Sequence, residues 1–154
     1  MVKNFLKLLL ASVALYAQQV LALWAEAGPQ SMVPHFRSNT DYSSLGAVHN
    51  VFIAATGAYA AQLATDPGSS LILGVLQNAP QQNEAMSIAV SGVSKVVAGG
   101  ALTVNAIITT NASGRAAAVA SGQIGCGRVL ETAGADGDVV TALLFHPVRW
   151  AGAA

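Results

Sequence analysis

Charged residues are scarce in this 154-residue sequence, where they make up only 9% of the chain. Ordinary soluble domains carry roughly 25%. Seven basic residues balance seven acidic ones, so no electrostatic attraction predicts binding to nucleic acid or to an anionic membrane surface. Because a net charge near zero favours association, the composition favours a protein that works within an assembly.

Cysteine and clustered metal ligands are scarce as well. Cys126 is the only cysteine, which excludes an internal disulfide and a multi-cysteine metal site. It lies among apolar residues, so we expect a small packed hydrophobic side chain. The three histidines (His35, His49 and His146) are far apart in sequence and lack metal-ligand spacing. We therefore expect no metal and no cofactor.

Catalytic motifs are missing too. Lys95 is the only lysine after residue 7, yet a Ser-x-x-Lys motif would need serine at position 92, where glycine stands. The glycine pair at 99–100 lacks the Lys-Ser/Thr that completes a phosphate loop. Lys95 is expected to lie on a solvated strand face, or to protect an edge strand against unwanted pairing. The sequence predicts a protein that is not an enzyme.

The first 28 residues are hydrophobic and allow several interpretations. Lys3 and Lys7 precede a charge-free run over residues 8–25, and Ala-Glu-Ala follows at 25–27, as in a secretory signal peptide. The run is also long enough to be considered as a membrane anchor. A third interpretation is a retained α-helix that Gly-Pro at 28–29 ends.

The spacing of apolar residues supports the retained helix, with Met32 as an alternative start of the chain. Apolar side chains recur at steps of four and three residues, which places them on one seam of a helix. Because its other faces are mostly alanine and leucine, such a helix would have to be buried against partners. The residues expected at a subunit or capsid interface are Leu9, Val13, Tyr16, Val20, Leu23 and Trp24.

Two further segments are expected to contact neighbours. Residues 29–46 are polar and are interpreted as an extended arm or linker, from which Phe36 and Arg37 anchor on a neighbouring subunit. Trp150 is followed only by a tail, 151–154. A large aromatic side chain there is expected either to fold back on the core or to be buried in a neighbouring subunit.

Residues 47–150 have the pattern of a β-domain. Glycine at 92 and at 114 predicts two hairpins, because primed turns and bulges need a positive φ. Pro147 is expected to end the last strand. Short strands separated by glycine-rich turns predict a small β-barrel or sandwich of antiparallel strands and hairpins. Strands are expected over residues 48–54, 71–76, 86–90, 93–97, 107–110, 115–119, 126–131 and 139–145.

An internal echo runs through this domain. The pattern Val-Leu-x-x-Ala-x-x-x-x-Glu at 75–84 recurs, with aspartate in the last place, at 129–138, which is an offset of 54 residues. An apolar strand is expected after each copy. The echo predicts two similar strand–loop–strand units related by a pseudo-twofold.

Three segments carry a resemblance to a known family. ILGVLQNAP at 72–80, AVSGVSKVVAGGAL at 89–102 and GRVLETAGADGD at 127–138 occur in this order, and together they resemble the small capsid decoration (head cement) proteins of tailed bacteriophages. The resemblance covers roughly residues 47–145, and the first 46 residues are not part of the pattern. It implies a compact β-domain without enzymatic activity, commonly a homotrimer, on the outer capsid surface of the virion. The implied partners are the major capsid protein and further copies of the chain, with no nucleic acid.

The N-terminal segment leaves an alternative function open. If residues 1–27 were removed, or used as a membrane anchor, the chain would be an exported bacterial β-domain in the envelope or outside the cell. The intact mass of the native protein separates these interpretations, because export by a cleaved signal removes residues 1–27.

Overall fold

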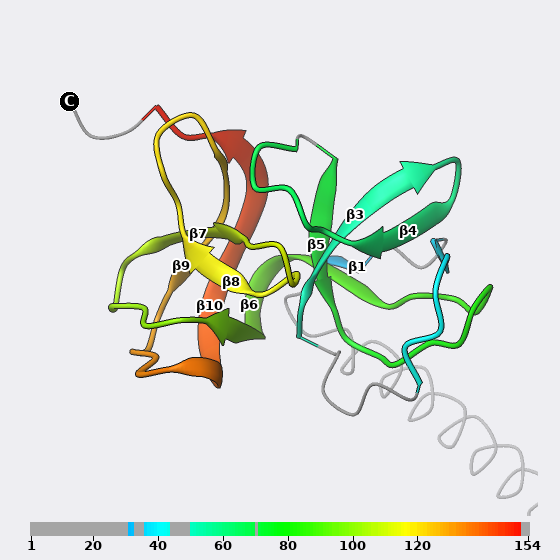
Figure 1. The fold of residues 1–154 in the computed structure, drawn as a ribbon, viewed down its shortest axis with the longest axis horizontal. Helices are drawn as coiled ribbons and strands as arrows, with labels where there is room; N and C mark the ends of the chain where they lie inside the picture. The colour runs from blue at the N-terminus through cyan, green and yellow to red at the C-terminus, as the bar shows by residue number, and fades with distance from the viewer. Residues whose placement is uncertain (1–30, 33–35, 44–49, 70, 152–154) are drawn as a thin grey trace, which may run out of the picture.

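The computed structural model describes residues 31–32, 36–43, 50–69 and 71–151 (Figure 1). These residues form strands and turns without a helix, which confirms the mostly β class. The helix predicted over residues 1–28 lies outside the described residues, and no described segment is a helix that could cross a bilayer. The strands are β1 (Ser31–Met32), β2 (Arg37–Ser38), β3 (Phe52–Gly57), β4 (Ala60–Leu63), β5 (Ile72–Leu76), β6 (Ile88–Gly99), β7 (Ile107–Thr110), β8 (Ala116–Ala118), β9 (Ile124–Val129) and β10 (Asp136–Arg149).

The strands form a ring with a second sheet attached to it through β6. In the ring, β6 pairs with β10, β10 with β9, β9 with β7 and β7 with β8. A single parallel pairing of Ala98 with Ala116 joins β8 back to β6 and closes the ring. The attached sheet has the order β1–β6–β5–β3–β4–β2. In Figure 1 the ring lies on the left and the β3–β4 hairpin projects on the right.

The hairpin predicted at Ser91 and Gly92 is wrong, because β6 continues through both residues. Gly92 does adopt a positive φ of 89°. Before it, Ala89 pairs with β1 and β5, and after it the strand pairs with β10. Glycine therefore supplies the left-handed backbone at the point where one strand leaves the attached sheet and enters the ring, as it does in many β-bulges.

The last strand also differs from the prediction. β10 runs to Arg149 and therefore passes through Pro147, which was expected to end it. Its register with β9 shifts between Leu144 and Val148. Proline is tolerated in this irregular stretch because a bulge does not require every backbone N–H for the ladder.

The glycine-based prediction holds for the turn between β7 and β8. These strands pair antiparallel, and Gly114 has a φ of 73°. The side-chain oxygen of Asn111 accepts hydrogen bonds from the backbone N–H groups of Ser113 (2.9 Å) and Arg115 (3.0 Å). Such a side-chain turn stabilises the reversal locally.

The central strands of the attached sheet, β3 and β5, carry buried side chains on both faces. On β3, Phe52 faces one hydrophobic cluster and its neighbour Ile53 faces the other, and Val75 and Leu76 divide in the same way on β5. Adjacent strand residues point to opposite faces, so these strands are continuously apolar instead of alternating. The first cluster extends into the ring, where it includes Ile108. One core therefore joins the ring to the sheet.

Candidate interaction surfaces

Within the described residues, the side chains that could bind a metal ion or act as a nucleophile do not come together in a site. No three His, Cys, Asp or Glu residues there lie close enough to hold a metal ion. Cys126 is buried, and the desolvation raises the pKa of its thiol to about 12. A thiol that stays protonated is a packed hydrophobic group, which confirms the expectation for this residue.

Lys95 lies on an exposed strand face, as predicted. Its ammonium group donates hydrogen bonds to Thr141 Oγ1 (2.8 Å) and to Glu131 Oε1 (3.3 Å). The Thr141 hydroxyl in turn donates to Glu131 Oε2 (2.9 Å). Chiefly this Thr141 hydrogen bond, with a smaller effect of Lys95, holds the pKa of Glu131 below its ordinary value. At this point β6 pairs with β10, where Thr141 lies opposite Lys95.

These side chains belong to a larger exposed face on the ring. Thr141 is flanked by Lys95 on β6 and by Leu130, whose N–H donates to the Thr141 carbonyl. Two residues along β10, Leu143 is paired with Arg128 of β9. We call this surface the outer ring face, and it comprises Lys95, Arg128, Leu130, Glu131, Val139, Thr141 and Leu143.

The outer ring face is unusually apolar for a strand surface open to solvent. Val139 is 51% exposed, and Leu130 and Leu143 are each 42% exposed. The sequence prediction missed this face. Its signal is the doubling of apolar residues in β10: Val139 precedes Val140, and Leu143 precedes Leu144. Neighbours on a strand point to opposite faces, and only one face of β10 is buried here, so one member of each pair is exposed.

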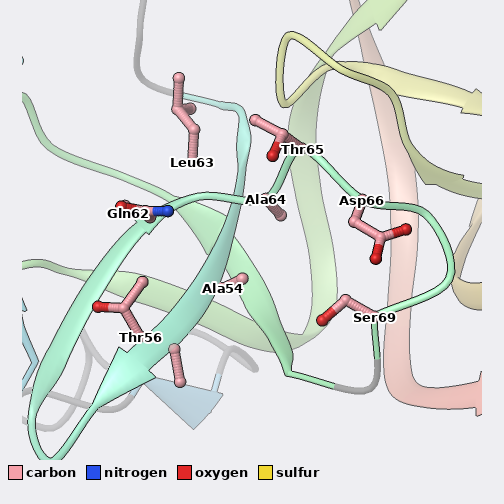
Figure 2. A pocket seen from close by; sticks show the side chains of 9 residues that line it. Ala54, Thr56, Gln62, Leu63, Ala64, Thr65, Asp66 and Ser69 are labelled. Carbon is pink, nitrogen blue, oxygen red and sulfur yellow. The ribbon is translucent and has the colours of Figure 1, made fainter.

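A second candidate surface consists of two shallow hollows beside β4. The hollow in Figure 2 measures about 170 Å³, and its labelled polar side chains come from the β3–β4 hairpin and the loop that follows it. Another, of about 220 Å³, shares Gln62, Leu63 and Thr65 with it. Asp66 Oδ1 accepts the N–H of Gly68, which ties that carboxylate to its own loop. Sites for small ligands usually enclose about 300–1,000 Å³, so neither hollow has the form of such a site.

The described part of the predicted arm is bonded to its own domain. The carbonyl of Phe36 accepts the N–H of Met86, and its side chain is half-buried against the second cluster. Arg37 is exposed and donates from Nη1 to the Asn83 carbonyl (2.8 Å). Tyr42 is buried, and its hydroxyl accepts the N–H of Leu63 (3.0 Å).

The remaining predicted interface residues are only partly placed. Trp150 is half-buried at the end of β10, where its N–H donates to the Gln123 carbonyl and its carbonyl accepts the N–H of Gly122. Its role at an interface stays a prediction. The predicted helix residues lie outside the described part of the chain: Leu9, Val13, Tyr16, Val20, Leu23 and Trp24.

Comparison with known proteins gives a likeness in structure. No protein-family model matches the chain, and no curated protein matches it in sequence. Among solved structures, the chain is similar to the head fiber gp8.5 N base of bacteriophage phi29, with a TM-score of 0.58 and 16% sequence identity. The likeness covers 76% of this chain and 97% of that one. At this identity it establishes a shared fold.

Proposed function

We propose that this chain is a structural protein of a bacteriophage virion that decorates the outer surface of the head and stabilises the shell. The observation that carries the proposal is the fold shared with the head fiber gp8.5 N base over 97% of that chain. The sequence resemblance to capsid decoration proteins supports the same role independently. In this proposal the chain is not an enzyme, and it binds the major capsid protein as a homotrimer.

The physical mechanism is the burial of protein surface against several capsid subunits at once, so that the contributions of the separate contacts add. A protein that contacts several capsid subunits at once binds only the assembled shell, so its binding free energy stabilises the shell by mass action. Exposed aliphatic side chains on a charge-poor domain suit such contacts, because removing apolar surface from water is favourable and few charged groups have to be desolvated. The predicted N-terminal helix would add a second contact, either to the capsid or to further copies of the chain.

The test compares phage particles that contain the protein with particles that lack it. We expect both to assemble, and we expect the particles without it to release their DNA at a lower temperature in a fluorescent-dye melt. Adding the purified chain back should restore the higher temperature. Electron microscopy of the same particles would show extra density on the outer surface only where the protein is present. Equal rupture temperatures would refute the cement role.

The alternative function is an exported bacterial β-domain, with a cleaved signal peptide or an N-terminal membrane anchor. The observation in its favour is the charge-free run after Lys3 and Lys7, followed by Ala-Glu-Ala at 25–27. Intact-mass spectrometry of the native protein separates the two functions. A full-length mass in purified particles supports the virion role, whereas loss of residues 1–27 from protein recovered outside the cell supports export.

A further inference from the structure

The outer ring face has a charge order that runs across its strands. Lys95 on β6 lies on one side of Thr141, and Glu131, which follows β9, lies on the other. The two side chains therefore reach over Thr141 from opposite sides of β10, and their charged groups meet in an ion pair, with 3.3 Å between Lys95 Nζ and Glu131 Oε1. Their side chains are 53% and 47% exposed, so both charges remain accessible to a second molecule.

This charge order is self-complementary in one orientation. A two-fold axis that runs parallel to β10 would place the β6 side of one molecule over the β9 side of the next. Each ammonium group would then lie over a carboxylate, and opposite charges at short range attract. A two-fold axis across the strands would instead place Lys95 over its own equivalent, and like charges repel. The charges therefore favour the first orientation.

The aliphatic side chains fit the same orientation. Val139 and Leu143 lie on β10 itself, so an axis parallel to β10 brings each of them against its symmetry equivalent. Sheets that pack face to face bury such side chains in a layer about 10 Å thick. An isologous contact of this kind needs only one patch on each molecule.

We propose that the outer ring face binds the same face of a second copy of this chain, through a two-fold axis parallel to β10. The contact is of the weak class, which buries less than about 1,200 Å² in total. It does not depend on the proposed function. A two-fold contact cannot build a trimer, so on a virion it would join copies that belong to neighbouring decoration sites.

The first test measures association of the full chain by sedimentation equilibrium, at concentrations from about 10 µM to about 1 mM, where weak contacts are populated. We expect the mass of the wild type to double across this range, and the Leu143→Asp variant to keep its starting mass. The matched control is Leu71→Asp. Leu71 is 58% exposed and immediately precedes β5 of the attached sheet, so this variant should associate like the wild type. A circular-dichroism melt verifies that each variant is folded.

The second test reverses the charges. Lys95→Glu should weaken association by about tenfold or more, since each interface then loses two attractive pairs. The double variant Lys95→Glu/Glu131→Lys should regain it, because the order of charge is inverted in both copies. Mixtures of wild type and double variant should form fewer mixed dimers than random pairing gives. Random pairing, or doubling of mass that Leu143→Asp leaves intact, would overturn the proposal. So would a wild type that never doubles its mass.

Discussion

Replacing Gly74 by alanine should damage the fold severely, although the change adds only one methyl group. Gly74 lies in β5, where β5 pairs with β6. A Cβ atom at this position would overlap the Ala89 carbonyl oxygen, and it would lie 2.9 Å from the Ala89 carbonyl carbon and 3.0 Å from Val90 Cα. All three atoms belong to the backbone of β6. Side-chain rotation therefore cannot relieve the contact, and the two strands would have to move apart.

The magnitude follows from where these strands lie. β5 contributes side chains to both hydrophobic clusters, since Val75 packs in one and Leu76 in the other, and both are fully buried. A separation of β5 from β6 would loosen both clusters at once. Overpacking a core costs about 1–3 kcal/mol and occasionally more. Because the clash is with backbone, we expect a loss of about 3 kcal/mol of unfolding free energy, a large part of the stability of an ordinary domain.

Urea unfolding followed by circular dichroism measures this loss. At an ordinary m-value, about 3 kcal/mol lowers the urea midpoint by roughly 1–3 M. Gly57→Ala is the matched control, because β3 there has no atom within 4 Å of an added Cβ and no positive φ. It should change stability by no more than about 0.5 kcal/mol. If both variants unfold at the same urea concentration, the inferred contact between β5 and β6 is wrong.

Three further predictions concern titrating and charged groups. Thr141→Val should raise the pKa of Glu131 towards its ordinary value, measured by NMR titration, and should do so more than Lys95→Met, because the hydroxyl is the larger cause of the lowered pKa. Burial raises the pKa of the Cys126 thiol from an ordinary 9.0 to about 12, so the unfolded state loses its proton first and stability falls as pH rises above 9. Relative to Cys126→Ala, wild type should lose about 1.4 kcal/mol per pH unit between pH 9 and 11 in urea melts; parallel pH profiles would contradict this. Asp136→Asn removes the exposed ion pair with Arg115 (2.7 Å) and should cost less than about 1 kcal/mol in the same assay.

Local sequence patterns predicted the strands that carry β-branched residues and the turns that carry glycine. Ile72–Leu76 and Ile107–Thr110 were expected almost as they occur, because both are short apolar runs bounded by turn residues. Ala60–Leu63 was not expected, since its sequence Ala-Ala-Gln-Leu has little β-propensity. It is a strand because it pairs with β3 across a tight turn, which is information that lies outside its own four residues.

Gly92 shows the limit of prediction from the local sequence. Its positive φ was predicted correctly, but a positive φ is compatible with a hairpin turn and with a bend inside a strand. The choice between them depends on pairing partners that are remote in sequence: β5 and β1 on one side of the bend, β10 on the other. The outer ring face was missed for a related reason, since the exposed member of each apolar pair in β10 is fixed by which face the ring encloses.

The echo, whose two copies lie 54 residues apart, predicts more of the fold than any single strand pattern does. The strands β4–β3–β5–β6 pair in the same order as β8–β7–β9–β10, and the two sets are joined antiparallel along β6 and β10. The two acidic residues of the echo also do the same thing. Glu84 accepts the N–H of Gln81 (2.8 Å), and Asp138 accepts that of Ala135 (2.9 Å), in each case three residues back.

A shared pairing order and a shared loop hydrogen bond make chance an inadequate explanation of the echo. The predicted pseudo-twofold is thus built into the domain, with its axis between β6 and β10. The two halves nevertheless differ where they end: β8 closes the ring on β6, whereas β4 is paired with the short strand β2. The asymmetry leaves β10 with one buried face and one exposed face, whereas at the start of β6 the neighbours Ile88 and Ala89 are both buried, one in each hydrophobic cluster. The outer ring face therefore exists because only the second of the two similar strand sets, β8–β7–β9–β10, closes into a ring with β6.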